Sequence, residues 1–191
     1  MNKNTIVLFD IDYTLFDTKS LKDIVYEKYF QDIEKALFLE NLKNLSEETL
    51  LKKRIRECLW KEVGSHLLYP ETLEIIEEFS KKVLVGIFSK GHQKFQREKI
   101  KSIKKFFEEE NVHIFLDKIS KLPEVLAKYL DKRIFIVDDS LEVLIEAKSI
   151  NPKVMTILVD REGKNFENNF KPDIVIKNLK ELEKHKIEIY A

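Results

Sequence analysis

Asp10 and Asp12 stand at the end of a short apolar run, in the stretch TIVLFDIDYTLFD that begins at Thr5. Side chains alternate along an extended chain, so two acids two positions apart lie on the same side of it. Paired carboxylates beside a buried strand are unfavourable unless a partner compensates for their charge. The pair therefore indicates a functional site, in which one carboxyl group attacks as a nucleophile and the other transfers a proton.

Polar side chains also follow three later apolar runs, at the point where each run ends. They are Ser89 and Lys90 after VLVGIF, Asp117, Lys118 and Lys121 after VHIFL, and Asp138 and Asp139 after RIFIV. In an open sheet of parallel strands, ligands bind at the carboxyl ends of the strands. We therefore expect these side chains to meet Asp10 and Asp12 in one crevice.

The elements that must position these residues alternate along the second part of the chain. Apolar runs predict strands, and helical spacing predicts helices between them. The expected strands are 5–9, 82–88, 112–116, 133–137, 153–159 and 173–176, and the expected helices are 71–80, 92–107, 123–130, 140–150 and 178–184. Such alternation predicts an α/β protein whose mostly parallel sheet carries helices on both faces.

The segment from about residue 19 to residue 64 has a different pattern. It contains no proline, and its first glycine is Gly64. Apolar residues recur at helical spacing in its first part and again between Leu50 and Trp60, so we expect two or three helices and no strand. Asp17 precedes the first of these helices and is expected to cap it or to lie in the hinge before it.

The residue types at the strand ends suit phosphoryl transfer through an aspartyl intermediate. Two like charges 4 Å apart repel by about 4 kcal/mol at an effective dielectric constant near 20, so several converging acids require a cation. Carboxylate and carbonyl oxygens select a hard ion, and Mg²⁺ is the expected cofactor. A lysine would neutralise the nucleophile and the phosphate.

These residues resemble the motifs of the haloacid dehalogenase-like phosphohydrolases. FDIDYTLFD looks like the first motif, DxDx[TV], IFSKGHQKFQREKI like the second, IFIVDDS like the fourth, and PDIVIKNLKEL like the closing strand and helix. The resemblance runs along nearly the whole chain in order. It implies a three-layer Rossmann-like core of mostly parallel sheet, formed by residues 1–18 and 67–191, with an inserted α-helical cap at 19–66.

The resemblance also implies roles for the four aspartates. Asp10 would be the nucleophile and a Mg²⁺ ligand. Asp12 would act first as general acid and then as the base for water, with its backbone carbonyl on the metal. Asp139, together with Asp138, would complete the metal site. Family members often carry a further acid about four residues beyond the fourth-motif aspartate, and Val143 occupies that place here.

The remaining family roles concern the phosphate and the lysine. Ser89 would donate to a phosphoryl oxygen, Lys90 would assist through its backbone amide, and Thr14 would support the turn of the first motif. Lys90 stands where many relatives have asparagine. The catalytic lysine is either Lys121 or Lys118, and Lys121 is the favoured choice because it directly precedes the expected helix start.

Asp12 bears on which reaction the family resemblance implies. A phosphomonoester releases an alkoxide that needs a proton, whereas a released halide needs none, so an acid at this position favours a phosphatase over a dehalogenase. A phosphomutase has the same residues and stays an alternative, as does a non-catalytic binding protein on this fold. The expected substrate is a small phosphorylated metabolite, selected by a cap that closes over the cleft.

Composition restricts the other classes of function. The 191-residue chain has 34 Lys and Arg against 34 Asp and Glu, so it has no overall basic field for nucleic acid. The Lys-rich stretch KFQREKIKSIKK is the best candidate for such a surface, but its charges are expected to be solvated. No apolar stretch is long enough for a signal peptide or a membrane span. With a single cysteine, the chain is expected to be a cytoplasmic protein of unspecified oligomeric state.

Overall fold

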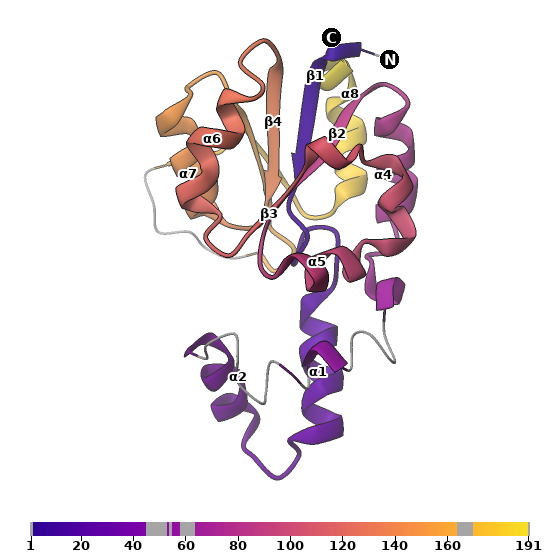
Figure 1. The fold of residues 1–191 in the computed structure, drawn as a ribbon, viewed down its shortest axis with the longest axis vertical. Coiled ribbons are helices and arrows are strands. Elements are labelled where there is room, and N and C mark those ends of the chain that lie inside the picture. The colour runs from indigo at the N-terminus through magenta and orange to yellow at the C-terminus, as the bar shows by residue number, and fades with distance from the viewer. Residues whose placement is uncertain (1, 45–52, 54, 58–63, 164–169, 191) are drawn as a thin grey trace.

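The computed structural model describes residues 2–44, 53, 55–57, 64–163 and 170–190 (Figure 1). Within these residues the chain forms one six-stranded sheet in which every neighbouring pair of strands is parallel. The strands are β1 (Asn2–Phe9), β2 (Val83–Lys90), β3 (Val112–Phe115), β4 (Arg133–Asp138), β5 (Met155–Val159) and β6 (Ile174–Ile176). Their order across the sheet is β3-β2-β1-β4-β5-β6, and all six predicted strands are confirmed.

The helices of the second part of the chain follow the predicted alternation. They are α4 (Thr72–Ser80), α5 (Gln93–Lys99), α6 (Leu122–Ala127), α7 (Leu141–Ile150) and α8 (Lys186–Tyr190). The helix predicted at 92–107 is shorter than expected, because its second half is the 3₁₀ segment η3 (Lys101–Phe106). The predicted terminal helix is likewise mostly the 3₁₀ segment η6 (Leu179–His185). Among the described residues, no helix has the length and apolar character needed to cross a membrane.

Two separate layers of helices cover the two faces of the sheet, and the apolar side chains of β1 alternate between them. Ile6 and Leu8 belong to one apolar cluster, which they share with residues of α6 and α7. Val7 and Phe9 belong to the other, which they share with residues of α4, η6 and α8. Because successive side chains of a strand point to opposite faces, β1 is buried on both sides. Figure 1 shows α6 and α7 on one side of the sheet and α4 and α8 on the other.

The first helices of the segment 19–66 lie outside these layers. They are α1 (Thr18–Tyr29) and α2 (Lys35–Asn44), and Figure 1 shows them beyond the carboxyl ends of the strands. Asp17 caps α1 as predicted, since its Oδ1 accepts a hydrogen bond from the Ser20 amide at 2.9 Å. Most of the further helix expected between residues 50 and 60 lies outside the described residues.

A close approach explains the one glycine inside a strand of the sheet. A Cβ atom on Gly86 would lie 2.6 Å from the carbonyl oxygen of Asn111 and 2.8 Å from the Cδ2 atom of Leu8. The Gly86→Ala variant is therefore expected to lose about 1–3 kcal/mol of unfolding free energy through overpacking. Urea denaturation followed by circular dichroism measures this loss. An unchanged transition midpoint would contradict the close packing.

Candidate active site

The register of the sheet places the acidic residues of the first and fourth motifs side by side. In β1 and β4, Phe9 is paired with Val137. The next amide, that of Asp10, donates to the Val137 carbonyl at 2.9 Å. Asp138 is the last residue of β4, so the two carboxylates leave neighbouring strands at the same edge of the sheet. The predicted convergence at the strand ends is confirmed for this pair.

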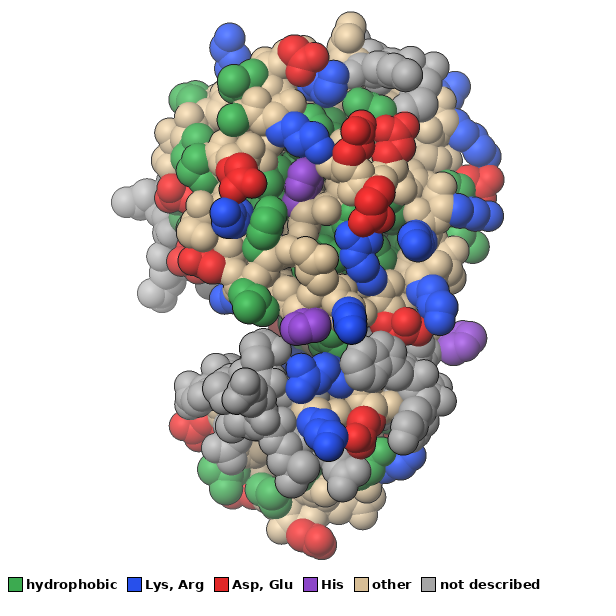
Figure 2. Space-filling model, viewed as in Figure 1, with side chains coloured by type: hydrophobic (Ala, Val, Ile, Leu, Met, Phe, Trp, Pro, Cys, Tyr) green, Lys and Arg blue, Asp and Glu red, His purple; other side chains and the backbone are tan. Residues whose placement is uncertain are grey.

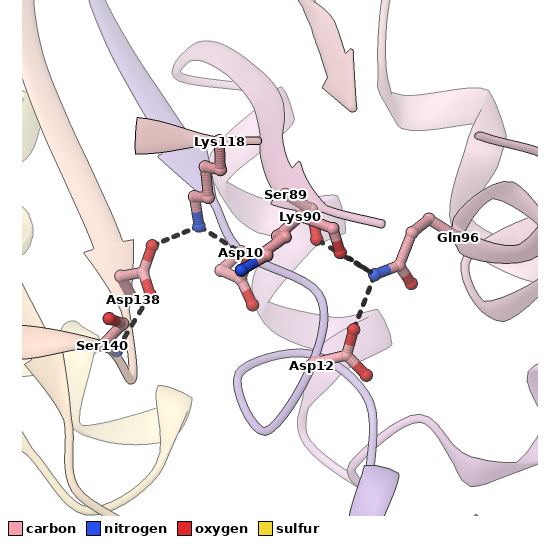
Figure 3. A network of polar contacts seen from close by, with 8 residues as sticks. All are labelled: Asp10, Asp12, Ser89, Lys90, Gln96, Lys118, Asp138 and Ser140. Atoms are coloured by element: carbon pink, nitrogen blue, oxygen red, sulfur yellow. Dashed lines mark hydrogen bonds and ion pairs between the residues drawn. The ribbon is translucent and has the colours of Figure 1, made fainter. Parts of the chain in front are cut away.

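Lys118 connects these two carboxylates (Figure 3). Its Nζ atom lies 2.7 Å from Oδ1 of Asp10, and it also donates to Oδ2 of Asp138. The side chains of Lys118 and Asp138 are only 3% and 1% exposed. The second carboxylate oxygen of Asp138 accepts from the amide of Ser140 at 2.9 Å. The three charged groups are therefore fixed in a largely buried network.

Burial and neighbouring charge perturb the acid–base chemistry of this network. The pKa of Asp10 is well above its ordinary value, chiefly because the carboxyl group is buried. The charge of Lys118 lowers this pKa in part, and repulsion by Asp138, Asp12 and Asp139 raises it. Burial opposes the charge of Lys118, but the attraction of Asp10 and Asp138 raises its pKa overall. Lys118 is therefore a permanent cation. One cation does not compensate for all the carboxylates around Asp10.

A group of three acids could hold a metal ion at this point. Asp10, Asp138 and Asp139 each offer a carboxylate oxygen, and these atoms lie within 4.8 Å of one another. An all-oxygen donor set is the set that Mg²⁺ prefers. A divalent cation would also supply the charge compensation that Asp10 lacks. The residues present therefore fit the predicted Mg²⁺ site, and occupancy of that site remains a prediction.

The two candidate lysines lie in different places. Lys118 is in contact with Asp10, whereas the Nζ atom of Lys121 lies 2.8 Å from a carboxylate oxygen of Glu124 in an exposed ion pair. A short 3₁₀ segment, η5 (Ile119–Lys121), separates the end of β3 from α6 and puts Lys118 next to the strand end. The geometry thus favours Lys118 over the preferred choice, Lys121, and its catalytic role stays a prediction.

Asp12 is held by a second network on the side of α5. Its Oδ1 atom lies 2.5 Å from Nζ of Lys99 and also accepts from the hydroxyl of Thr18, and its Oδ2 atom lies 2.6 Å from Nε2 of Gln96. Figure 3 shows Gln96 between Asp12 and the end of β2, where it also donates to the carbonyl of Lys90 at 2.5 Å. These contacts fix the orientation of the predicted acid–base residue.

The same contacts determine which form of Asp12 is stable. Burial alone would raise the pKa of Asp12. The charge of Lys99 and the hydrogen bonds from Gln96, Lys99 and Thr18 together lower it by more than burial raises it, so the pKa of Asp12 is below its ordinary value. Asp12 is therefore a carboxylate at neutral pH in this arrangement. Lys99 is itself only 2% exposed, and its Nζ atom lies 5.4 Å from the ring centroid of Phe16 and 4.6 Å from that of Phe95.

The predicted phosphate ligands do not all line the same cavity. Lys90 lines the cavity in front of Asp10, together with Asp12. Ser89 is fully buried behind it, and its hydroxyl is 3.5 Å from Nε2 of Gln96. Thr14 is also fully buried and does not line this cavity. Its hydroxyl has no hydrogen-bond partner among the described residues, so its role in supporting the turn of the first motif stays a prediction.

The loop after β1 has a strained residue and an arginine that secures it. Tyr13 has a φ of 58°, in the left-handed region that is unfavourable for a side chain of this size. Its amide donates to the Phe16 carbonyl at 2.9 Å. Arg161 donates to the carbonyls of Tyr13 and Thr14 at 3.1 and 2.8 Å and to Glu71 at 2.9 Å. This clamp joins the first-motif loop to the start of α4.

Sequence reasoning missed the residues that orient Asp12 and its loop: Gln96, Lys99, Thr18 and Arg161. A signal was present for two of them. Gln96 and Lys99 share one helical face with Ile100 and Ile103, at spacings of three, four and seven residues, and all four side chains are buried. The prediction that the charges of this stretch are solvated is therefore wrong for Lys99. No comparable pattern marks Arg161.

The cavity in front of Asp10 gathers most of the predicted site. It has a volume of about 290 Å³. Its lining comes from the ends of β1, β2 and β4 and from the segment after β3. The lining residues that the sequence had singled out for the site are Asp10, Asp12, Lys90, Asp117, Lys118, Asp138 and Asp139.

Comparison with protein-family models finds no match to the sequence, and comparison with curated proteins finds none either. Solved structures are similar along the whole chain. An inferred haloacid dehalogenase-like hydrolase from Burkholderia xenovorans LB400 shares 20% identity at a TM-score of 0.74, covering 99% of each chain. The inferred HAD-hydrolase YfnB from Bacillus subtilis, solved bound to magnesium, shares 15% at 0.68, covering 96% of this chain and 99% of its own.

L-2-haloacid dehalogenase from Xanthobacter autotrophicus, solved with chloropropionic acid covalently bound, shares 14% identity at a TM-score of 0.67. That comparison covers 98% of this chain and 99% of the dehalogenase. These similarities extend over the helical segment as well as the sheet. The fold that the motifs imply is thus confirmed: the protein has the haloacid dehalogenase-like fold.

Proposed function

We propose that the protein is a Mg²⁺-dependent phosphomonoester hydrolase that acts on a small phosphorylated metabolite through an aspartyl-phosphate intermediate. The observation that carries the proposal is the joint presence of Asp10, Asp12 and the buried Lys118 around one cavity. A nucleophile, an acid–base group and a fixed cation are the parts that phosphoryl transfer requires.

In the first step, a carboxylate oxygen of Asp10 attacks phosphorus and the bond between phosphorus and the leaving oxygen breaks. Asp12 gives its proton to that oxygen. Asp12 is ionised in the resting arrangement, so in this proposal it receives the proton, when the substrate binds, from solvent water or from the monoanionic form of the phosphomonoester. In the second step Asp12 removes a proton from water, the water oxygen attacks phosphorus, and the bond from phosphorus to Asp10 breaks.

Lys118 and the three-acid group set the electrostatics of these steps. Lys118 favours the anionic, nucleophilic form of Asp10 and attracts the phosphoryl group. A Mg²⁺ ion at Asp10, Asp138 and Asp139 would neutralise charge on the phosphoryl oxygens. The role of the segment 19–66 in this proposal is that of a cap, whose first helix lies over the strand ends and whose closure excludes water.

A dehalogenase is the second candidate, because haloacid dehalogenases are among the structures that share this fold. One feature of the site favours the phosphatase. A dehalogenase has no use for an acid held at Asp12, since a halide leaves without a proton.

The metal part of the proposal predicts a thermal effect as well as activity. Mg²⁺ at a hundred times its dissociation constant stabilises the native state by about 2.7 kcal/mol. For a chain of this size the melting temperature is therefore expected to rise by roughly 5–10 °C. Differential scanning calorimetry with Mg²⁺ and with EDTA measures the shift. The Asp139→Asn variant should lose most of it.

The catalytic part is tested by hydrolysis of p-nitrophenyl phosphate and of a panel of small phosphomonoesters. Turnover is expected with Mg²⁺ and is expected to disappear with EDTA. Release of chloride from 2-chloropropionate, measured on the same preparation, tests the dehalogenase. A folded protein that hydrolyses no phosphomonoester and shows no Mg²⁺-dependent melting shift would contradict the proposal.

A further inference from the structure

Among the described residues two lysine side chains are buried, Lys99 and Lys118, and the proposed mechanism uses only Lys118. Most of the other lysines are exposed, and Figure 2 shows Lys and Arg side chains spread over one face of the molecule. Lys118 contacts Asp10, whereas Lys99 contacts the proposed acid–base residue, Asp12. A buried cation in contact with a group that transfers protons is a candidate for a part in the reaction.

The turn between β2 and α5 brings Lys99 to Asp12. Gly91, directly after β2, has a φ of 142°, a conformation that favours glycine. Its lack of a side chain also leaves room for Gln96, because a Cβ atom on Gly91 would lie 2.8 Å from Nε2 of Gln96. Gln96 and Lys99 share one face of α5. From that face Lys99 contacts Oδ1 of Asp12 and Gln96 contacts Oδ2.

The ammonium group of Lys99 is itself held in place. It lies within reach of cation–π attraction from the rings of Phe16 and Phe95. Its Nζ atom is 2.5 Å from Oδ1 of Asp12. A cation with these three contacts has little freedom to move, so it restricts the carboxylate that it touches. Asp12 lines the cavity in front of Asp10, which is where a proton must be given and taken.

Stability alone gives no reason for a charge at position 99. The neighbouring buried side chains of this face, Ile100 and Ile103, are apolar. A buried ion pair often contributes no more stability than apolar residues of the same volume, because both charges lose their hydration. An apolar side chain at position 99 would therefore suit the core. Only a hydrogen-bond donor there can orient Asp12.

We propose that Lys99 is a positioning residue for both proton transfers, because it holds the carboxyl group of Asp12 at the cavity in front of Asp10. The inference rests on the proposed function and adds a residue to its acid–base steps. Asp12 gives a proton to the leaving oxygen in the first step and takes one from water in the second. Lys99 does not line this cavity, so it acts through Asp12.

Two aryl phosphates of similar shape separate this role from a structural one. p-Nitrophenyl phosphate releases an anion that needs no proton, whereas phenyl phosphate releases a more basic oxygen that gains from one. With Mg²⁺, Lys99→Met is expected to lower kcat/KM at least about tenfold for phenyl phosphate and less than about threefold for p-nitrophenyl phosphate. The kcat for p-nitrophenyl phosphate should fall at least about tenfold, after a burst of p-nitrophenol, because the second step needs Asp12 as a base.

The matched control is Lys94→Met, which makes the same substitution at an exposed position of α5. It should leave each kinetic constant within about twofold. Lys99→Gln keeps a polar group at the buried position and is the second variant if Lys99→Met does not fold. The same selective loss is expected for it. Circular dichroism melting curves establish that each variant is folded.

Equal losses with the two substrates, or unchanged constants, in a folded Lys99 variant would overturn the inference while the phosphatase stands. A wild type without turnover would reject the proposed function instead. Crystal structures of the wild type and the Lys99 variant then test the positioning separately. The Asp12 carboxyl group is expected to rotate away from its wild-type position in the variant. An Asp12 side chain that keeps the same position in both would overturn the inference on its own.

Discussion

Replacement of Asp10 by asparagine is expected to lower the turnover of phosphomonoesters by at least about 10³-fold, because no other described group is placed to accept the phosphoryl group. The change is nearly isosteric. It also removes one charge from a cluster in which burial and like charges already raise the pKa of Asp10. The variant should therefore fold, and without metal it should be at least as stable as the wild type at neutral pH.

Stopped-flow or steady-state release of p-nitrophenol measures the effect. Asp117→Asn is the matched control, since Asp117 lines the same cavity but is exposed and makes its hydrogen bonds with Ser120. The control should retain turnover within about threefold. Substantial Mg²⁺-dependent turnover by a verified Asp10→Asn preparation would show that the nucleophile is elsewhere.

Replacement of Lys118 by methionine is expected to affect both turnover and stability. Removal of one fixed cation from a transition state of this kind lowers kcat by roughly 10²–10³-fold. The same change leaves Asp10 and Asp138 buried without their shared partner, which costs about 3–5 kcal/mol of unfolding free energy at neutral pH in the absence of metal. Chemical denaturation and steady-state kinetics measure the two losses separately.

The stability loss in Lys118→Met should depend on pH. Without Lys118, the folded-state pKa of Asp10 rises further above its unfolded value. The unfolded chain then releases the proton first, so stability is retained below the unfolded pKa and falls as pH rises toward the folded pKa. Mg²⁺ should restore part of the stability without restoring turnover.

The matched control for Lys118 is Lys121→Met, because Lys121 lies at the other end of the same 3₁₀ segment in an exposed pair with Glu124. An exposed pair of this kind contributes about 0–1 kcal/mol, and its loss should leave kcat unchanged. The opposite pattern, with Lys121→Met inactive and Lys118→Met active, would mean that the loop rearranges when substrate binds.

The parts of the fold that depend on periodicity were predictable from the sequence. Runs such as Ile6 to Phe9 are apolar at every position, which is the pattern of a strand buried on both faces. The convergence of Asp10 and Asp138 followed from the same argument, because parallel strands end at one edge of the sheet. These inferences need only local pattern and the rule for parallel sheets.

The choice between Lys118 and Lys121 was not predictable in that way. The expected strand ended at Leu116 and the expected helix began at Pro123, and both lysines fall between them. Only the 3₁₀ turn after Lys118 decides which of them reaches Asp10, and its sequence carries no strong signal. The network around Asp12 was missed for a related reason. Lys99 is buried because a carboxylate from a distant segment meets it, and helical spacing alone cannot predict that partner.

In the proposed reaction, Asp10 carries the phosphoryl group between the two steps. The Asp12→Asn variant should accumulate this intermediate with p-nitrophenyl phosphate, because p-nitrophenolate leaves without a proton whereas hydrolysis of the intermediate needs the base. Mass spectrometry of the acid-quenched and digested variant is predicted to find a phosphoryl group on Asp10, and none there when Asp10 is also replaced by asparagine. A wild type that releases phosphate while Asp10 stays unmodified in the Asp12→Asn variant would contradict the account.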